Sequence, residues 1–250
     1  QDNLPGIAGT FAAPGIQCEA CHGAGSEHVG APSHENITKI ATPRTTEAFL
    51  AEDMAYGQAV SCSECHTRDG EMDYPTYVGG PGLIKAKGGL IRHQEQYDDM
   101  IGIDPDDVDA GPTGPHRNLA CTACHDPHKT TKYMAVSGDD PGMNTACTDC
   151  HDATTYEITT GGMAEFQCIT CHMPFTAKSA VSHDAVGTGP ATGDIRAHIF
   201  RIDLSAEKQF TDDGAYAYPW ITGSFACMTC HNGETSFNID FPSTMTIHGN

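Results

Sequence analysis

The sequence predicts a chain that is mostly coil, with a few short α-helices and little β-structure. Three observations support this. Hydrophobic residues make up only 38% of the 250 residues, below the usual globular share. Glycine (27) and proline (15) are plentiful, which favours loops. All 12 cysteines occur in one short motif that recurs along the chain. Something other than aliphatic side chains is therefore expected to supply much of the core.

Every cysteine belongs to a Cys-x-x-Cys pair, and a histidine follows every pair directly. The cysteines are Cys18, Cys21, Cys62, Cys65, Cys121, Cys124, Cys147, Cys150, Cys168, Cys171, Cys227 and Cys230, and the histidines are His22, His66, His125, His151, His172 and His231. On a helical turn, positions i, i+3 and i+4 share one face. Both sulfurs can then form thioethers to one porphyrin while the histidine reaches its iron. Cys-x-x-Cys-His is the haem c attachment signature, so we expect six haem c groups with these histidines as proximal ligands.

Other chemistry uses Cys-x-x-Cys pairs as well. Structural zinc sites, thioredoxin-like redox pairs and disulfide frameworks all contain them. None of these requires a histidine directly after the second cysteine, and six such histidines out of six pairs is far too regular for chance. Six haems in 250 residues leave too little chain for separate globular cytochromes. We therefore expect a single domain over residues 1–250 whose core is six packed haems.

Eight histidines lie outside the motifs: His28, His34, His93, His116, His128, His183, His198 and His248. Bis-histidine ligation of six irons needs six of them, so two are spare. The nine methionines are alternative ligands, but several lie close beside attachment motifs, where reaching their own haem is awkward (Met143, Met163, Met173 and Met228). We expect bis-histidine ligation throughout. His93 shares a helical spacing with Leu90, Tyr97 and Met100, and the proline in Cys-His-Asp-Pro-His directs His128 toward a neighbouring haem.

Three segments resemble recurring segments of the bis-histidine multihaem cytochromes of respiratory electron transfer. They are Cys-His-Gly-Ala-Gly-Ser-Glu-His, Cys-His-Asp-Pro-His, and Cys-His-Met-Pro together with the later Asp-Ile-Arg-Ala-His-Ile-Phe. The resemblance as a whole covers most of residues 18–231. In that family the trailing histidine usually ligates a different haem. The resemblance implies a multihaem cytochrome c fold and the distal ligands His28, His93, His116, His128 and His198. His248 completes the expected set, and His34 or His183 can replace a member.

The remaining elements follow from local patterns. We expect helices at 46–58 and 90–101, a short helical turn at each motif, and strands at 157–160 and 199–204. Gly/Pro-rich stretches at 79–89, 105–115, 137–142 and 187–193 are expected to be loops that wrap haems. The motifs recur at unequal intervals, which argues against a solenoid. Two patterns are weaker. An acidic run is expected to be a solvated loop rather than a calcium site; it consists of Asp98, Asp99, Asp104, Asp106, Asp107 and Asp109. A triplet of the N-glycosylation type begins at Asn36.

The net charge of −20 disfavours nucleic acid and anionic membranes as partners. No apolar stretch of about 18 residues occurs, so we expect no membrane span. The sequence starts at Gln1, and we expect a mature exported chain from which a leader has been cleaved. Haem c attachment in the family also implies export, to the cell surface or the extracellular space, with the periplasm as the alternative.

Bis-histidine ligation leaves no open iron position, so we expect an electron-transfer protein and not an enzyme. The size per haem, the low secondary structure and the terminal histidine resemble polymeric surface cytochromes of the OmcS and OmcE type, which form conductive filaments (nanowires). That resemblance implies as partners copies of the same chain, with His28 or His248 ligating a haem of the next subunit, other redox proteins and extracellular electron acceptors. The alternatives are a soluble periplasmic shuttle and, third, a multihaem reductase with an open haem site.

Overall fold

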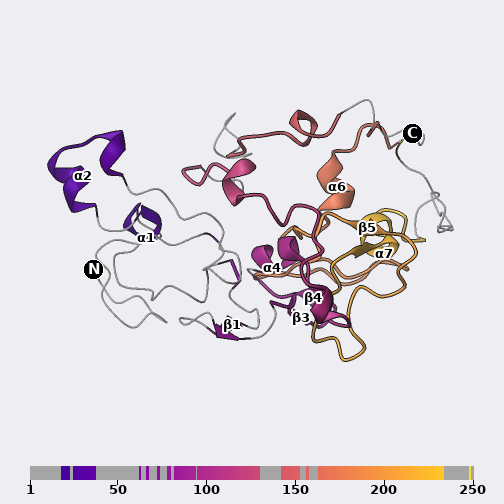
Figure 1. The fold of residues 1–250 in the computed structure, drawn as a ribbon. Helices are drawn as coiled ribbons and strands as arrows, with labels where there is room; N and C mark the ends of the chain where they lie inside the picture. Colours follow the sequence, from indigo (N-terminus) through magenta and orange to yellow (C-terminus); the bar gives the residue numbers. More distant parts are fainter. Residues whose placement is uncertain are drawn as a thin grey trace. The chain divides into compact units, whose positions relative to one another are not determined.

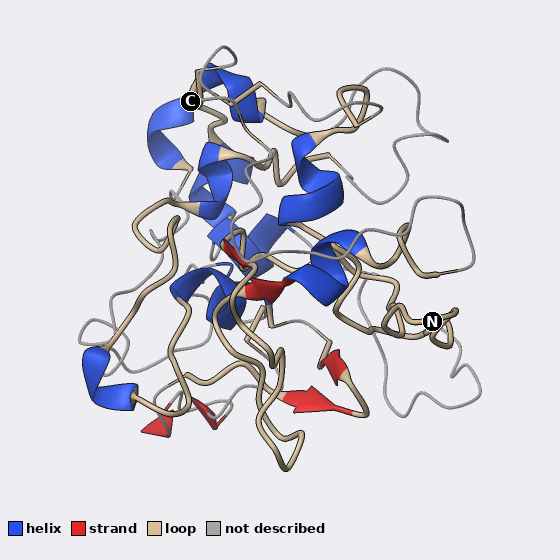
Figure 2. Ribbon diagram, turned by 90° about the vertical axis from the view of Figure 1, so that its right-hand side faces the viewer, coloured by secondary structure: helices blue, strands red, loops and turns tan. Residues whose placement is uncertain are grey.

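The computed structural model describes residues 18–22, 25–37, 62, 66–67, 72–73, 78–79, 82–93, 95–129, 142–152, 156–157, 163–233 and 248. Contacts within the chain divide it into two units, unit 1 (residues 1–64) and unit 2 (residues 65–250). Loops and turns dominate the described residues (Figures 1 and 2). The expected mostly coil architecture, with few short helices and little strand, is thus confirmed. The single-domain organisation stays a prediction.

The helices and strands are short throughout. The α-helices are α1 (Cys18–His22), α2 (Ser26–Gly30), α4 (Gln96–Ile101), α6 (Cys168–His172) and α7 (Gly223–Cys227), and the 3-10 helices are η1 (His34–Asn36), η3 (Val108–Ala110), η4 (Cys121–Ala123) and η5 (Cys147–Asp149). The strands are β1 (Met72–Asp73), β2 (Val78–Gly79), β3 (Ala86–Lys87), β4 (Leu90–Ile91), β5 (Ile202–Asp203) and β6 (Ile221–Thr222). In the described residues these strands form three two-stranded sheets: β5–β6 is parallel, and β1–β2 and β3–β4 are antiparallel. The predicted strand at 199–204 thus contains β5, while 46–58 and most of 157–160 lie outside the described residues.

Five attachment motifs, those that begin at residues 18, 121, 147, 168 and 227, form the helical turns that their spacing predicts, whereas the motif that begins at residue 62 lies partly outside the described residues. α1 and α6 coincide with whole motifs. In the motifs that begin at residues 121, 147 and 227, the histidine N–H donates to the carbonyl of the first cysteine at 2.9–3.0 Å. This i to i+4 bond places cysteine and histidine on one side of the turn.

The expected helix at 90–101 is wrong in its first half. Leu90 and Ile91 form β4, which pairs with β3 across a two-residue turn made by Gly88 and Gly89. Both glycines have positive φ, +64° and +77°, the backbone geometry that tight hairpins require. Helix α4 begins only at Gln96, so His93 lies in the link before it. The same hairpin corrects the loop predicted at 79–89.

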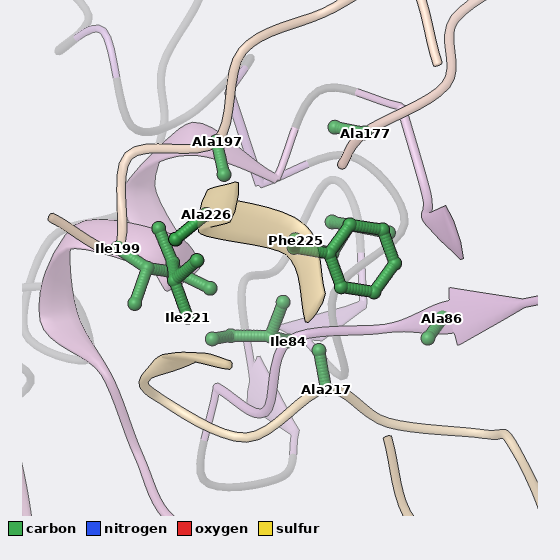
Figure 3. Packing of buried hydrophobic residues seen from close by; sticks show 10 residues of the cluster. Ile84, Ala86, Ala177, Ala197, Ile199, Ala217, Ile221, Phe225 and Ala226 are labelled. Atoms are coloured by element: carbon green, nitrogen blue, oxygen red, sulfur yellow. The ribbon is translucent and has the colours of Figure 1, made fainter. Parts of the chain in front are cut away.

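Unit 2 has a small aliphatic core beside the last attachment motif. Ten buried side chains form it, and in Figure 3 Ile84, Ile199 and Ile221 gather beside α7, which contributes Phe225 and Ala226. Ile84, Ile199 and Ile221 are almost completely buried. Side chains therefore supply part of the packing that was expected from porphyrins alone, and they anchor the segment that precedes β5.

Two aspartates of the expected solvated loop are buried instead. Asp98 and Asp99 lie on α4 and are 1% exposed. Asp98 accepts a hydrogen bond from the Thr67 hydroxyl at 2.6 Å, and Asp99 accepts one from the backbone N–H of His198 at 2.9 Å. Burial raises the pKa of each carboxyl to about 7. The solvated-loop prediction fails for these two residues because α4 packs its acidic side inward.

Candidate functional site

The motifs of unit 2 lie next to one another in the order of the sequence. Burial raises the pKa of four motif thiols. A nearby cysteine of the adjacent motif raises the pKa of each of these thiols further. The pairs, with the affected thiol first, are Cys124 and Cys150, Cys147 and Cys168, Cys171 and Cys230, and Cys227 and Cys171. These sulfurs become thioethers once haem is attached. Helix α6, which is the whole fifth motif, packs against helix α7, which ends at the first cysteine of the sixth motif. The motifs that begin at 121, 147, 168 and 227 therefore form a row.

The first histidine pair stands at the motif that begins at residue 121. His125 and His198 have ring centroids 6.1 Å apart and planes 33° apart. Burial lowers the pKa of His198 to about 4, and the neighbouring His125 contributes to this shift. Burial also lowers the pKa of His125, and the neighbouring His66 lowers it further. Both rings are therefore neutral at neutral pH, which is the form that binds a metal.

The second pair stands at the motif that begins at residue 168. His172 and His248 have centroids 5.9 Å apart and planes 21° apart. The Nδ1 of His172 lies 2.7 Å from the carbonyl oxygen of Phe200, and the Nδ1 of His248 lies 2.9 Å from that of Tyr156. A carbonyl only accepts, so Nδ1 carries the proton in both rings and Nε2 carries the lone pair for a metal.

The third pair stands at the motif that begins at residue 147. His116 and His151 have centroids 5.9 Å apart, but their planes cross at 72°. Burial lowers the pKa of His116, and the neighbouring His151 and His172 lower it further. The ring of Phe200 packs edge-on against His116 at 4.4 Å.

The three pairs fit a haem iron held between two imidazoles. With a metal–nitrogen bond of about 2.0 Å and about 1.1 Å from ring centre to nitrogen, opposed ligands have centroids about 6.2 Å apart. The observed separations are 5.9–6.1 Å. In each pair one member is a motif histidine and the other is one of the predicted distal ligands. The donor set therefore suits haem, and His198, His116 and His248 lie beside His125, His151 and His172.

The other predicted distal ligands lie in different settings. In unit 1, the Nδ1 of His28 lies 3.0 Å from Asn36 Oδ1 and 3.2 Å from Ser33 O, so its Nε2 carries the lone pair. His93 is half-buried ahead of α4. His128 is 76% exposed and lies 3.4 Å from Asp126. The two spare candidates, His34 and His183, are both exposed. The distal ligand roles of all six histidines stay predictions: those of His28, His93 and His128, and also those of His116, His198 and His248.

Sequence reasoning missed the residues that hold the ligands in place. Arg196 donates to the carbonyls of Ile169 and Met173, which belong to α6 and its C-cap. Asp99 fixes the backbone at His198, and Phe200 touches three histidines. Arg196 and Phe200 belong to the segment Asp-Ile-Arg-Ala-His-Ile-Phe, in which the sequence pattern indicates a function for His198 alone.

A family model described as a doubled CXXCH motif matches residues 114–156, which hold the third and fourth attachment motifs. No curated protein matches the chain. Among solved structures, the octahaem sulfite reductase MccA of Wolinella succinogenes, form II, aligns with a TM-score of 0.45 and 21% identity. The alignment covers 84% of this chain and 40% of that one, so this chain spans less than half of the reductase's length.

These findings support covalently bound haem c, while the count of six stays a prediction. The expectation that the chain is not an enzyme is corrected, because the similar solved chain is a sulfite reductase and the exclusion of enzymatic activity no longer stands. At this TM-score and identity the likeness assigns no reaction to this chain. Haem c proteins are exported, and no helix among the residues described above is long and apolar enough to cross a bilayer.

Proposed function

We propose that this chain, which is a multihaem c-type cytochrome, carries electrons along a row of bis-histidine-ligated haems. The observation that carries the proposal is the set of three imidazole pairs, 5.9–6.1 Å apart, at consecutive motifs. Haem, when bound, supplies the ferric–ferrous couple. The chain supplies the axial ligands and fixes their orientation.

The protein groups around these pairs favour stable low-spin ligation. Carbonyl acceptors fix the tautomers of His172 and His248, which orients each Nε2 and raises its basicity. Asp99 holds the backbone at His198 through a 2.9 Å hydrogen bond. These three histidine pairs would occupy both free coordination positions of a bound haem, so no position would remain there for a small molecule to bind the metal. The same ligation at all six haems is part of the proposal.

In its finer form, the proposal is an extracellular conductive filament similar to the OmcS and OmcE type. His248 lies beside His172 of its own chain, so of the two terminal histidines His28 is the candidate that ligates a haem of the next subunit. Its Nδ1 faces Asn36 and Ser33, and Nε2 remains to bind iron. The alternative is a soluble periplasmic shuttle, which the net charge of −20 favours because it steers the protein to basic partners.

The filament form is tested by electron microscopy of the secreted protein and of its His28→Ala variant. We expect wild-type filaments, and short or single particles with a full haem complement for His28→Ala. His34→Ala is the matched control, because His34 is an exposed histidine of the same unit and is not predicted to ligate a haem of the next subunit. Single wild-type particles at every protein concentration would favour the shuttle.

A further inference from the structure

Phe200 has an unusual backbone conformation. Its φ is +62°, and it is the only non-glycine residue with positive φ in the part of the chain that the structure describes. A bulky L-residue is strained in this region and keeps it only where its surroundings determine it fully. Here they do, because Ile199 before it is almost completely buried, and Arg201 after it accepts a 2.7 Å hydrogen bond from the Ile221 N–H.

Phe200 contacts one histidine from each of the three pairs. Its carbonyl oxygen lies 2.7 Å from the Nδ1 of His172. Its ring stands edge-on to His116, at 4.4 Å and 87°, and to His198, at 5.8 Å and 85°. The backbone of Phe200 thus contacts a histidine at the motif that begins at residue 168, and its ring contacts histidines at the motifs that begin at residues 147 and 121.

We infer that Phe200 is a positioning residue that sets the axial ligand orientation of three neighbouring haems at once. The inference rests on the proposed bis-histidine ligation and deepens it. The two contributions separate chemically. The carbonyl fixes the tautomer of His172. The ring limits the rotation of His116 and His198, which sets the angles between the paired imidazole planes.

The test compares the holoprotein with three variants by electron paramagnetic resonance of the ferric haems. The crossed planes of His116 and His151, at 72°, give a low-spin signal distinct from that of the nearly parallel pairs, because crossed ligands bring two iron d orbitals close in energy. Phe200→Gly removes the ring but adopts the positive φ without strain, so the carbonyl stays in place. Phe200→Tyr keeps the ring. Phe210→Leu is the matched control, since Phe210 packs against Phe225 in the aliphatic core.

We expect Phe200→Gly to shift or lose the crossed-plane signal, and to gain carbon monoxide binding at the haems ligated by His116 and His198. The signal of the haem ligated by His172 and His248 stays unchanged. Phe200→Tyr and Phe210→Leu retain the wild-type spectrum. An unchanged spectrum in Phe200→Gly, or an equal change in Phe210→Leu, would overturn the inference. Carbon monoxide binding by these haems in the wild-type protein would instead refute the bis-histidine ligation on which it rests.

Discussion

His248 shows how much of the coordination depends on single side chains far from the motifs. Its ring lies 5.9 Å from that of His172, and its Nδ1 contacts the carbonyl of Tyr156. The Tyr156 ring also lies edge-on to His151, at 5.3 Å. His248 therefore lies beside the motif histidine His172 and, through Tyr156, adjoins a second motif histidine, His151.

Removing His248 should open one iron position. We expect His248→Ala to convert one haem from low spin to high spin, and its reduced form to bind one carbon monoxide per chain more than wild type, because no second imidazole replaces the ligand. Absorbance and resonance Raman spectra measure both effects. His183→Ala is the control, since His183 is exposed and joins a bridge to Thr192 through its backbone. Equal spectra for His248→Ala and wild type would contradict the pairing.

The sequence predicts proximal sites far better than distal pairings. Cysteine and histidine of one motif meet within a single helical turn, so their spacing alone specifies the contact. His198 and His125 meet only because α4, the 194–200 segment and the 121 motif fold together. The sequence therefore indicated that these histidines were ligand candidates and left their partners open. Phe200 escaped notice because a positive φ has no sequence signal at a phenylalanine.

At the scale of elements, the 194–200 segment holds α6 in place. Arg196 donates to the carbonyls of Ile169 at 3.0 Å and Met173 at 2.8 Å, and its guanidinium lies 4.2 Å from the centre of the Phe175 ring. These bonds satisfy carbonyls at the end of a five-residue helix that carries His172. Such a short helix has little stability of its own, so it depends on this clamp.

We expect Arg196→Lys to destabilise the holoprotein by roughly 1–3 kcal/mol, because lysine cannot reproduce a two-carbonyl contact and ring stacking together. Guanidinium unfolding followed by haem absorbance measures the loss. Arg117→Lys serves for comparison, since Arg117 is exposed and donates to a single carbonyl, that of the buried Gly114. The clamp is refuted if both variants lose the same small amount.

Local chemistry explains which elements were foreseen. Turns at the motifs follow from the attachment spacing, and β5 from the run of β-branched and aliphatic residues near Ile202. The helix at 90–101 was predicted too long because Leu90 has helical spacing to His93. The glycine pair before Leu90 instead forms a tight turn, which places Leu90 and Ile91 in the second strand of a hairpin.

At the scale of the whole molecule, buried carboxyls link stability to pH. Burial raises the pKa of Asp98 from 3.8 to about 7, although the Thr67 hydroxyl partly offsets this. The folded chain then binds more protons than the unfolded chain between these values. This group therefore makes the free energy of unfolding fall as pH rises from about 4 to about 7, with no further loss above that.

Asp98→Asn should flatten that dependence and raise the stability of the holoprotein at pH 8, since the amide keeps an acceptor for Thr67 without a charge. Denaturant unfolding at pH 5 and pH 8 measures it. Asp107→Asn is the control at an exposed aspartate of the same acidic run. If the free energy of unfolding of Asp98→Asn depends on pH as steeply as that of the wild type, the pKa of Asp98 is not raised in the folded protein and the prediction is wrong.

An experimental structure of the holoprotein, at a resolution that shows the axial ligands, tests the proposed row of haems. We expect iron between His125 and His198, between His151 and His116, and between His172 and His248, with haems in the order of their motifs. Water or an empty position on any of these three irons, or a different histidine opposite the motif histidine, would contradict it.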